Sequence, residues 1–196
     1  MKKILQRDAP VLRKIAEEVP LDSIGSKELN KVLEEMKEAL LSQDDGVAIA
    51  APQIGYPLRI FVISNKVETI MREEREIALG ISPELNKSET AMTETSTTED
   101  LVFINPVIKK ISKERKLVEE GCLSVRYLYG KVNRATKVKI EAYDENGKKF
   151  ERGGTGLLAQ IFQHETDHLD GVLFIDKAKD LEEMPPVKSK TTKDEK

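Results

Sequence analysis

The sequence predicts an α+β fold, because short strand-like segments outnumber helices and one helix is apolar enough to lie at the centre of a domain. A chain of 196 residues with 39% apolar residues suits one domain with a hydrophobic core. Its charged fraction of 34% is high, so we expect part of the chain to remain in solvent. We assign residues 1–180 to one domain with a disordered insertion at about 66–100, and residues 181–196 to a flexible tail.

The expected strands are short segments rich in β-branched and aromatic residues, or segments in which apolar and polar residues alternate. They lie at residues 58–64, 101–104, 107–111, 137–143 and 148–151. The sequence Asp-Glu-Asn-Gly at 144–147 predicts a turn that joins the last two strands as a hairpin.

Two segments have helical periodicity. Residues 28–42 carry apolar side chains at steps of three and four, which predicts an amphipathic scaffold helix. Residues 156–169 form the second helix, with Thr155 as the expected N-cap and Gly171 as the stop. Between the strands at 58–64 and 101–104, the charged stretch at residues 67–79 is a candidate helix. The stretch Ser88–Asp100 consists almost entirely of Ser, Thr, Glu and Asp, so we expect a solvated loop.

The bulk properties argue against several classes of protein. A net charge of −3 gives no reason to expect direct recognition of nucleic acid, and no apolar run is long enough to cross a membrane. The start of the chain lacks the apolar stretch of a signal peptide. A single cysteine excludes an internal disulfide, so we expect a cytoplasmic protein.

Both histidines of the chain lie in one pentad, His164-Glu165-Thr166-Asp167-His168. Positions four apart share a helix face, so both imidazoles can reach one divalent cation. Glu165 then lies where it can take a proton from metal-bound water, which makes metal-dependent hydrolysis the first hypothesis. Leu157 and Ile161 extend the same face, so the ligands lie at the edge of the core. A chance match with two ordinary polar histidines is the alternative.

A hydrolytic site needs a third protein ligand, and the candidates are a carboxylate or Cys122, which lies in the segment Glu-Gly-Cys-Leu-Ser at 120–124. A thiolate ligand is compatible with Fe²⁺, Ni²⁺, Co²⁺ or Zn²⁺. A third segment, Gly-Val-Ala-Ile-Ala-Ala-Pro-Gln at 46–53, has small residues that allow another chain to approach, and Gln53 offers an amide donor. Taken alone, this segment is typical of a tightly packed turn.

These three segments in this order resemble peptide deformylase, whose motifs are GxGLAAxQ, EGCLS and QHExDH. The second and third motifs are intact at 120–124 and 163–168, whereas the first has Ala48 in place of glycine and Ile49 in place of leucine. The family also generally lacks the insertion at 66–100. The resemblance covers most of residues 1–65 and 101–180, and it implies antiparallel β-sheets packed around the HExxH helix.

The resemblance implies a metal held by Cys122, His164 and His168, with Glu165 as general base and acid. The backbone N–H of Leu123 and the side-chain amide of Gln53 would stabilise the oxyanion. The implied substrate-binding residues are Gly46, Val47, Ala48, Leu157 and Ile161. Arg134 is a candidate to support the site by pairing with Glu120 or Asp167, although ordinary surface charge pairing is the favoured alternative, and Arg126 is expected near the peptide exit.

The implied reaction removes formate from N-formylmethionyl nascent peptides during protein biosynthesis. Ferrous iron is the implied metal, with nickel, cobalt or zinc as substitutes, and a place near the ribosomal exit tunnel is a further expectation. Three alternatives stay open: a zinc peptidase, a closed structural metal site, and a deformylase-like binding protein that has lost activity through its altered first motif.

Overall fold

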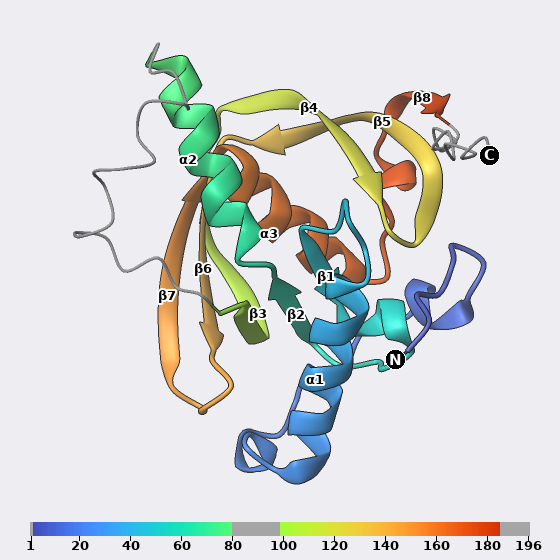
Figure 1. The fold of residues 1–196 in the computed structure, drawn as a ribbon, viewed down its shortest axis with the longest axis vertical. Helices are drawn as coiled ribbons and strands as arrows, with labels where there is room; N and C mark the ends of the chain where they lie inside the picture. The colour runs from blue at the N-terminus through green and yellow to red at the C-terminus, as the bar shows by residue number, and fades with distance from the viewer. Residues whose placement is uncertain (1, 80–98, 185–196) are drawn as a thin grey trace, which may run out of the picture.

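Helix α3 (Gly156–Leu169) packs against two antiparallel sheets in the computed structural model (Figure 1). The structure describes residues 2–79 and 99–184. One sheet has five strands in the order β1-β2-β3-β6-β7, and the other has three strands in the order β4-β5-β8. The predicted α+β class, with antiparallel sheets around the helix that carries both histidines, is therefore confirmed.

The strands of the larger sheet are β1 (Ala48–Ala50), β2 (Ile60–Ile63), β3 (Leu101–Ile111), β6 (Lys137–Tyr143) and β7 (Lys149–Thr155). The smaller sheet contains β4 (Arg115–Cys122), β5 (Val125–Ala135) and β8 (Lys179–Glu183). The other helices are α1 (Lys27–Leu41), α2 (Lys66–Ala78) and four short 3-10 helices, η1 (Pro10–Arg13), η2 (Leu21–Ser23), η3 (Ala51–Ile54) and η4 (Phe174–Asp176).

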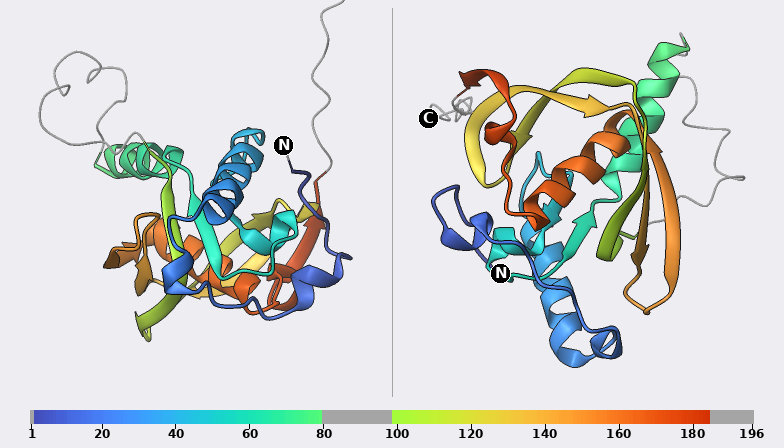
Figure 2. Two further views of the ribbon diagram at one scale, coloured as in Figure 1. Left: turned by 90° about the horizontal axis from the view of Figure 1, so that it is seen from below. Right: turned by 180° about the vertical axis from the view of Figure 1, so that it is seen from behind.

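The part of the larger sheet formed by β1 and β2 is buried on both faces, which explains why β2 is apolar at every position. Alternate side chains of a strand point to opposite faces. Phe61 and Ile63 accordingly pack in the cluster that contains α3, and Ile60 and Val62 pack in the cluster that contains α1. The two helices lie on opposite sides of this sheet (Figure 2). Helix α3 is therefore buried against one face of this sheet, in the middle of the molecule.

The predicted helix at 28–42 and the predicted hairpin at 137–151 both form. Helix α1 begins after Ser26, whose hydroxyl accepts a hydrogen bond from the Leu29 backbone N–H at 3.2 Å. In the hairpin turn, Asp144 Oδ1 accepts hydrogen bonds from the backbone N–H groups of Asn146 and Lys148, both at 2.9 Å. Thr155 occupies the N-cap position of α3 as expected, but its side chain makes no capping hydrogen bond.

The first part of the insertion assigned to disorder is ordered, and the candidate helix at 67–79 forms there. Helix α2 occupies residues 66–78, because Val67 is buried in the core beside α3 and Met71 packs against the same cluster. All but the last two residues of the expected solvated loop at 88–100 lie outside the described residues. The first residues assigned to the tail belong to β8, and residues 185–196 also lie outside the described part. Within the described part, no helix is long and apolar enough to cross a bilayer.

Candidate metal centre

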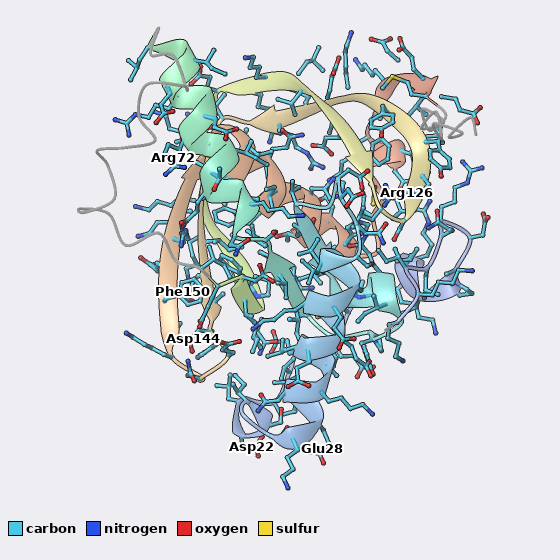
Figure 3. All side chains as sticks on the ribbon, viewed as in Figure 1. Asp22, Glu28, Arg72, Arg126, Asp144 and Phe150 are labelled. Carbon is cyan, nitrogen blue, oxygen red and sulfur yellow. The ribbon has the colours of Figure 1, made fainter. Side chains whose placement is uncertain are left out.

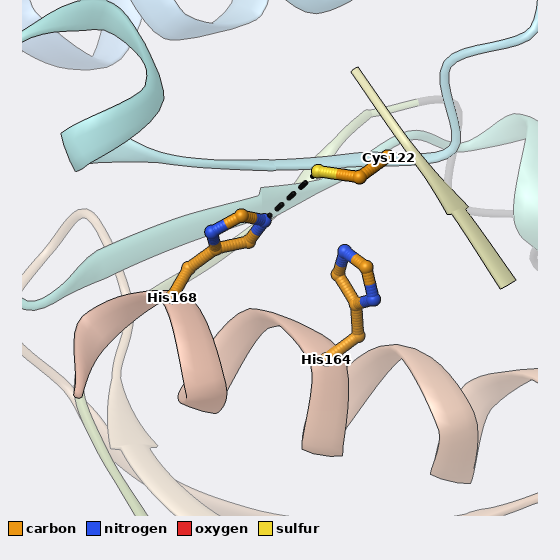
Figure 4. Close-up of side chains that lie close together, drawn as sticks. All are labelled: Cys122, His164 and His168. Atoms are coloured by element: carbon orange, nitrogen blue, oxygen red, sulfur yellow. Dashed lines mark hydrogen bonds between the residues drawn. The ribbon is translucent and has the colours of Figure 1, made fainter. Parts of the chain in front are cut away.

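Three potential metal ligands converge where the end of β4 meets α3. His164 and His168 lie one helical turn apart on α3, with ring centroids 5.0 Å apart. Cys122 ends β4, and its Sγ lies 3.2 Å from Nε2 of His168 (Figure 4). The ligand atoms of all three residues lie within 4.8 Å of one another, and no other such group of His, Cys, Asp or Glu occurs among residues 2–79 and 99–184. Metal–ligand bonds of about 2.0–2.3 Å require a similarly close cluster, so these residues suit one shared ion.

Glu120 fixes the orientation of His164. Its Oε2 lies 3.0 Å from His164 Nδ1, which leaves Nε2 as the ring nitrogen available to a metal. Arg134 holds Glu120 with two hydrogen bonds, of 2.7 and 2.9 Å, and donates a third of 2.6 Å to Asp167. The candidate pairing of Arg134 with Glu120 or Asp167 is therefore confirmed for both acids. Lys177 Nζ donates to the other oxygen of Asp167 at 2.6 Å, which ties η4 to α3.

The charges of this network favour an anionic site. Burial alone would raise the pKa of the Glu120 carboxyl, but hydrogen bonds from Arg134 and His164 outweigh burial and lower that pKa to about 2. Burial would likewise raise the pKa of the Cys122 thiol, yet the charge of His168 and a hydrogen bond to His164 lower it to about 5. Cys122 is therefore present as a thiolate at neutral pH, which is the form that binds metals.

Glu165 lies next to the ligands with one oxygen free. The residue is 4% exposed, and its Oε2 has no hydrogen-bond partner among the described residues. Burial, the main influence on this carboxyl, raises its pKa. A buried carboxylate with an unused acceptor and a raised pKa is suited to take up a proton from a bound reactant.

Gln53 faces the same centre from η3. Its Oε1 accepts a hydrogen bond of 2.8 Å from the Ala50 backbone N–H, which turns Nε2 towards the β4–β5 turn. Nε2 donates to Ser124 Oγ at 3.1 Å and lies 3.6 Å from Cys122 Sγ. The side chain is 2% exposed, so its amide is held in place as a donor near the thiolate.

Comparison with known proteins agrees with this geometry. Residues 1–184 match the polypeptide deformylase family. The chain belongs to this family. Over 177 residues it is 38% identical to "Peptide deformylase 1A, chloroplastic" from Solanum lycopersicum, covering 90% of this chain and 59% of that protein. The chain thus spans less than two thirds of the length of the tomato relative.

A bacterial relative and a solved structure extend the comparison. "Peptide deformylase" from Fusobacterium nucleatum is 36% identical over 175 residues, which cover 89% of this chain and 82% of that protein. A class I type b peptide deformylase from Acinetobacter baumannii, solved with Met-Ala-Ser bound, superposes with a TM-score of 0.70 at 28% identity. That match covers 90% of this chain and 98% of the Acinetobacter chain.

The centre opens into a cleft of about 260 Å³. All five residues that the resemblance assigned to substrate binding line it: Gly46, Val47, Ala48, Leu157 and Ile161. Cys122, Leu123, Gln53 and His164 line the cleft as well. Helical spacing predicted that Leu157, Ile161 and His164 share a face. Spacing alone did not indicate that this face meets Gln53 and Cys122.

Ala48 fits its position without backbone strain. It lies in β1, paired with Ile63, and it is not among the described non-glycine residues with positive φ. The departure from the deformylase motif therefore adds one methyl group in an extended segment that needs no glycine.

Several cleft residues were missed from the sequence. Gln160 lies three residues after Leu157 and four before His164, so helical periodicity could have placed it on the metal face. Asp45, Tyr127 and Tyr129 also line the cleft, but they carry no local signal of this role.

Proposed function

We propose that this protein removes the formyl group from N-formylmethionyl peptides and releases formate. The observation that carries the proposal is the buried Glu165, with an unpaired oxygen, beside a cluster of Cys122, His164 and His168 at a cleft. A structural metal site would have no use for such a carboxylate. Membership of the deformylase family supports the reaction class.

In this proposal Cys122, His164 and His168 hold one divalent ion. When bound, the ion supplies a Lewis acid that polarises the formyl carbonyl and makes water nucleophilic at neutral pH. The preformed thiolate and the Glu120-oriented imidazole fit such an ion. We propose ferrous iron as the ion, since a thiolate–imidazole site accepts Fe²⁺ and also Ni²⁺, Co²⁺ or Zn²⁺.

Glu165 moves the proton. It accepts a proton from the attacking water as the new C–O bond forms, and delivers it to the amine nitrogen as the C–N bond breaks. Its pKa, raised by burial, suits both steps, because the group must gain and lose the proton near neutral pH.

Gln53 and Leu123 stabilise the charge that develops on the formyl oxygen. Nε2 of Gln53 is already fixed by the contact of Oε1 with Ala50, so little reorganisation accompanies the reaction. The backbone N–H of Leu123 is the second proposed donor. Loss of one such donor in other enzymes lowers kcat by about 10²–10³.

The methionine side chain occupies the apolar part of the cleft beside Val47, Leu157 and Ile161. Gly46 and Ala48 flank Val47 along the cleft and offer backbone groups to the peptide. We propose that the protein acts in the cytoplasm near the ribosomal exit tunnel, because its proposed substrate is the nascent chain, and co-sedimentation with translating ribosomes tests that part of the proposal.

The test is formate release from formyl-Met-Ala-Ser by anaerobically prepared, Fe²⁺-loaded protein. Wild type should release formate, and Glu165→Gln should lose at least about 10²-fold in kcat while keeping its metal. Glu151→Gln, on the exposed strand β7, is the matched control and should retain activity. Full activity in Glu165→Gln, or no release by metal-replete wild type, would refute the proposal.

The identity of the metal needs its own test. Ferrous protein exposed to air should lose activity together with bound iron, whereas Ni²⁺-loaded protein kept beside it should remain active. Activity of iron-loaded protein that survives long aeration would contradict Fe²⁺ as the working ion.

A further inference from the structure

An ion pair joins the two walls of the cleft. Arg126, near the start of β5, donates from one terminal nitrogen to Asp45 Oδ2 at 2.6 Å and from the other to Gln43 Oε1. Asp45 and Gln43 lie in the loop that leads from α1 into β1, on the opposite wall. Both Arg126 and Asp45 line the cleft, and Figure 3 shows Arg126 where the β4–β5 hairpin faces that loop.

The two partners are held with unequal firmness. The side chain of Arg126 is 26% exposed, whereas that of Asp45 is 58% exposed. The Arg126 backbone N–H donates to Gln6 Oε1 at 3.4 Å, and the carbonyl of the next residue, Tyr127, accepts from the Met184 N–H at 2.8 Å. The guanidinium is therefore presented from an anchored hairpin, and Asp45 is the partner that can leave. Exposed ion pairs of this kind are weak enough to exchange one carboxylate for another.

The position of the pair relates it to the substrate. The proposed reaction takes place at the end of the cleft that is lined by Gln53, Cys122 and His164. Apolar residues next to them would hold the methionine. The residues that follow methionine must leave between the two walls, which Arg126 and Asp45 join. A carboxylate on one of those residues can replace Asp45 on the guanidinium, whereas a lysine would bring a second positive charge to it.

We propose that Arg126 selects peptides by the charge of the residue that follows methionine, with Asp45 as an internal competitor. This charge selection rests on the proposed function, because the proposed function supplies the formylmethionyl peptide as substrate. It predicts that acidic residues are preferred over basic ones. Two described carboxylates besides Asp45 line the cleft. Glu120 is buried and engaged by Arg134 and His164, whereas Glu119 is exposed and could favour a basic residue, so Glu119 must be tested separately.

The experiment measures peptide binding, which does not depend on turnover. Calorimetry with metal-loaded protein compares the unformylated peptides Met-Asp-Ser and Met-Lys-Ser, with Met-Ala-Ser as the neutral reference. Wild type should bind the acidic peptide about fivefold more tightly than the basic one, as expected for one partly exposed charge pair. Arg126→Gln should bring this ratio close to one, and Asp45→Asn should raise it, because the competitor is gone. The ratio should also fall in high salt.

Two further variants make the outcomes distinct. Lys37→Gln breaks the pair with Glu145, which has similar exposure and lies outside the cleft, and it should leave the ratio unchanged. Glu119→Gln should not abolish the preference. An unchanged ratio in Arg126→Gln, a lower ratio in Asp45→Asn, or a preference for Met-Lys-Ser that disappears in Glu119→Gln would each overturn the proposal.

Formate release measured alongside separates this proposal from the proposed function. If wild type binds peptides by charge but releases no formate from formyl-Met-Ala-Ser, the reaction is wrong and the charge selection stands. If formate is released with equal kcat/KM from the aspartate and lysine peptides, and their binding is equal, the charge selection alone is wrong.

Discussion

Replacing Arg134 with methionine should destabilise the protein far more than breaking any surface ion pair. The Arg134 side chain is 5% exposed, and it pairs with Glu120, which is 1% exposed. Arg134→Met keeps the apolar stem and leaves the Glu120 carboxylate buried without its main partner. Removal of one member of a buried pair costs about 3–5 kcal/mol, a large part of the roughly 5–15 kcal/mol that stabilises a typical domain.

The same variant should weaken metal binding. Glu120 would lose its two hydrogen bonds from Arg134 and would hold the His164 ring less firmly. Loss of such a supporting partner typically lowers metal affinity about 10–100-fold. Competition with a chelator of known affinity measures this change.

Urea unfolding of the metal-loaded protein measures the free energy of unfolding. Arg13→Met is the matched control, because Arg13 pairs with Asp176 at 42% and 38% exposure and its loss should change stability by about 0–1 kcal/mol. The double variant Arg134→Met/Glu120→Gln should recover part of the loss, since it removes the uncompensated charge. A loss below about 1 kcal/mol in Arg134→Met would refute this reasoning.

Four other predictions follow from single features. Tyr127 has φ of 67°, a left-handed conformation that is strained for residues other than glycine. Tyr127→Gly should therefore leave the free energy of unfolding in urea unchanged or raise it by up to about 1 kcal/mol, and a large loss would contradict the claim that the Tyr127 backbone is strained. A Cβ on Gly154 would lie 2.9 Å from the Phe162 ring and 3.1 Å from the Ala159 backbone nitrogen, so Gly154→Ala should cost about 1–3 kcal/mol in the same assay; a neutral effect would mean that α3 can shift away from β7. Removal of metal with a chelator should lower Tm, because an ion present at 100 times its Kd stabilises the fold by about 2.7 kcal/mol; an unchanged Tm in protein shown to have lost its metal would argue against the site. Burial would raise the pKa of Asp176, but the hydrogen bonds from Arg13 and the Leu173 backbone N–H, together with the charges of Arg13 and Lys177, outweigh burial and lower that pKa. The stabilisation is therefore present above the unfolded pKa and is lost as the pH falls through the folded pKa. Asp176→Asn should reduce the loss of stability measured by acid titration below about pH 4, and an identical acid profile would contradict the assignment.

Much of the fold could be predicted because its elements carry local signals. Helix α1 and strands β3, β6 and β7 lie within a few residues of the predicted segments, since burial on one face or both imposes a period on the sequence. The two histidines of α3 share a face for the same reason. Helical periodicity of this kind depends only on neighbouring residues.

The hairpin of β4 and β5 was not predicted, although it carries Cys122. Strand β4 is mostly exposed, so its sequence has no alternation of apolar and polar residues to reveal it. The position of β4 in the fold is set by its pairing with β5 at eight residues and by hydrogen bonds with α3. Neither of these interactions is a local property of the sequence. For that reason the residues alone left the third ligand open, and family resemblance pointed to Cys122.

The claim most central to this account is that Cys122, His164 and His168 hold the metal, and X-ray absorption at the metal edge tests it most directly. Zinc-loaded wild type should show one sulfur at about 2.3 Å and imidazole nitrogens at about 2.0–2.1 Å, and Cys122→Ser should lose the sulfur. A wild-type spectrum without sulfur, or one that Cys122→Ser leaves unchanged, would contradict the account.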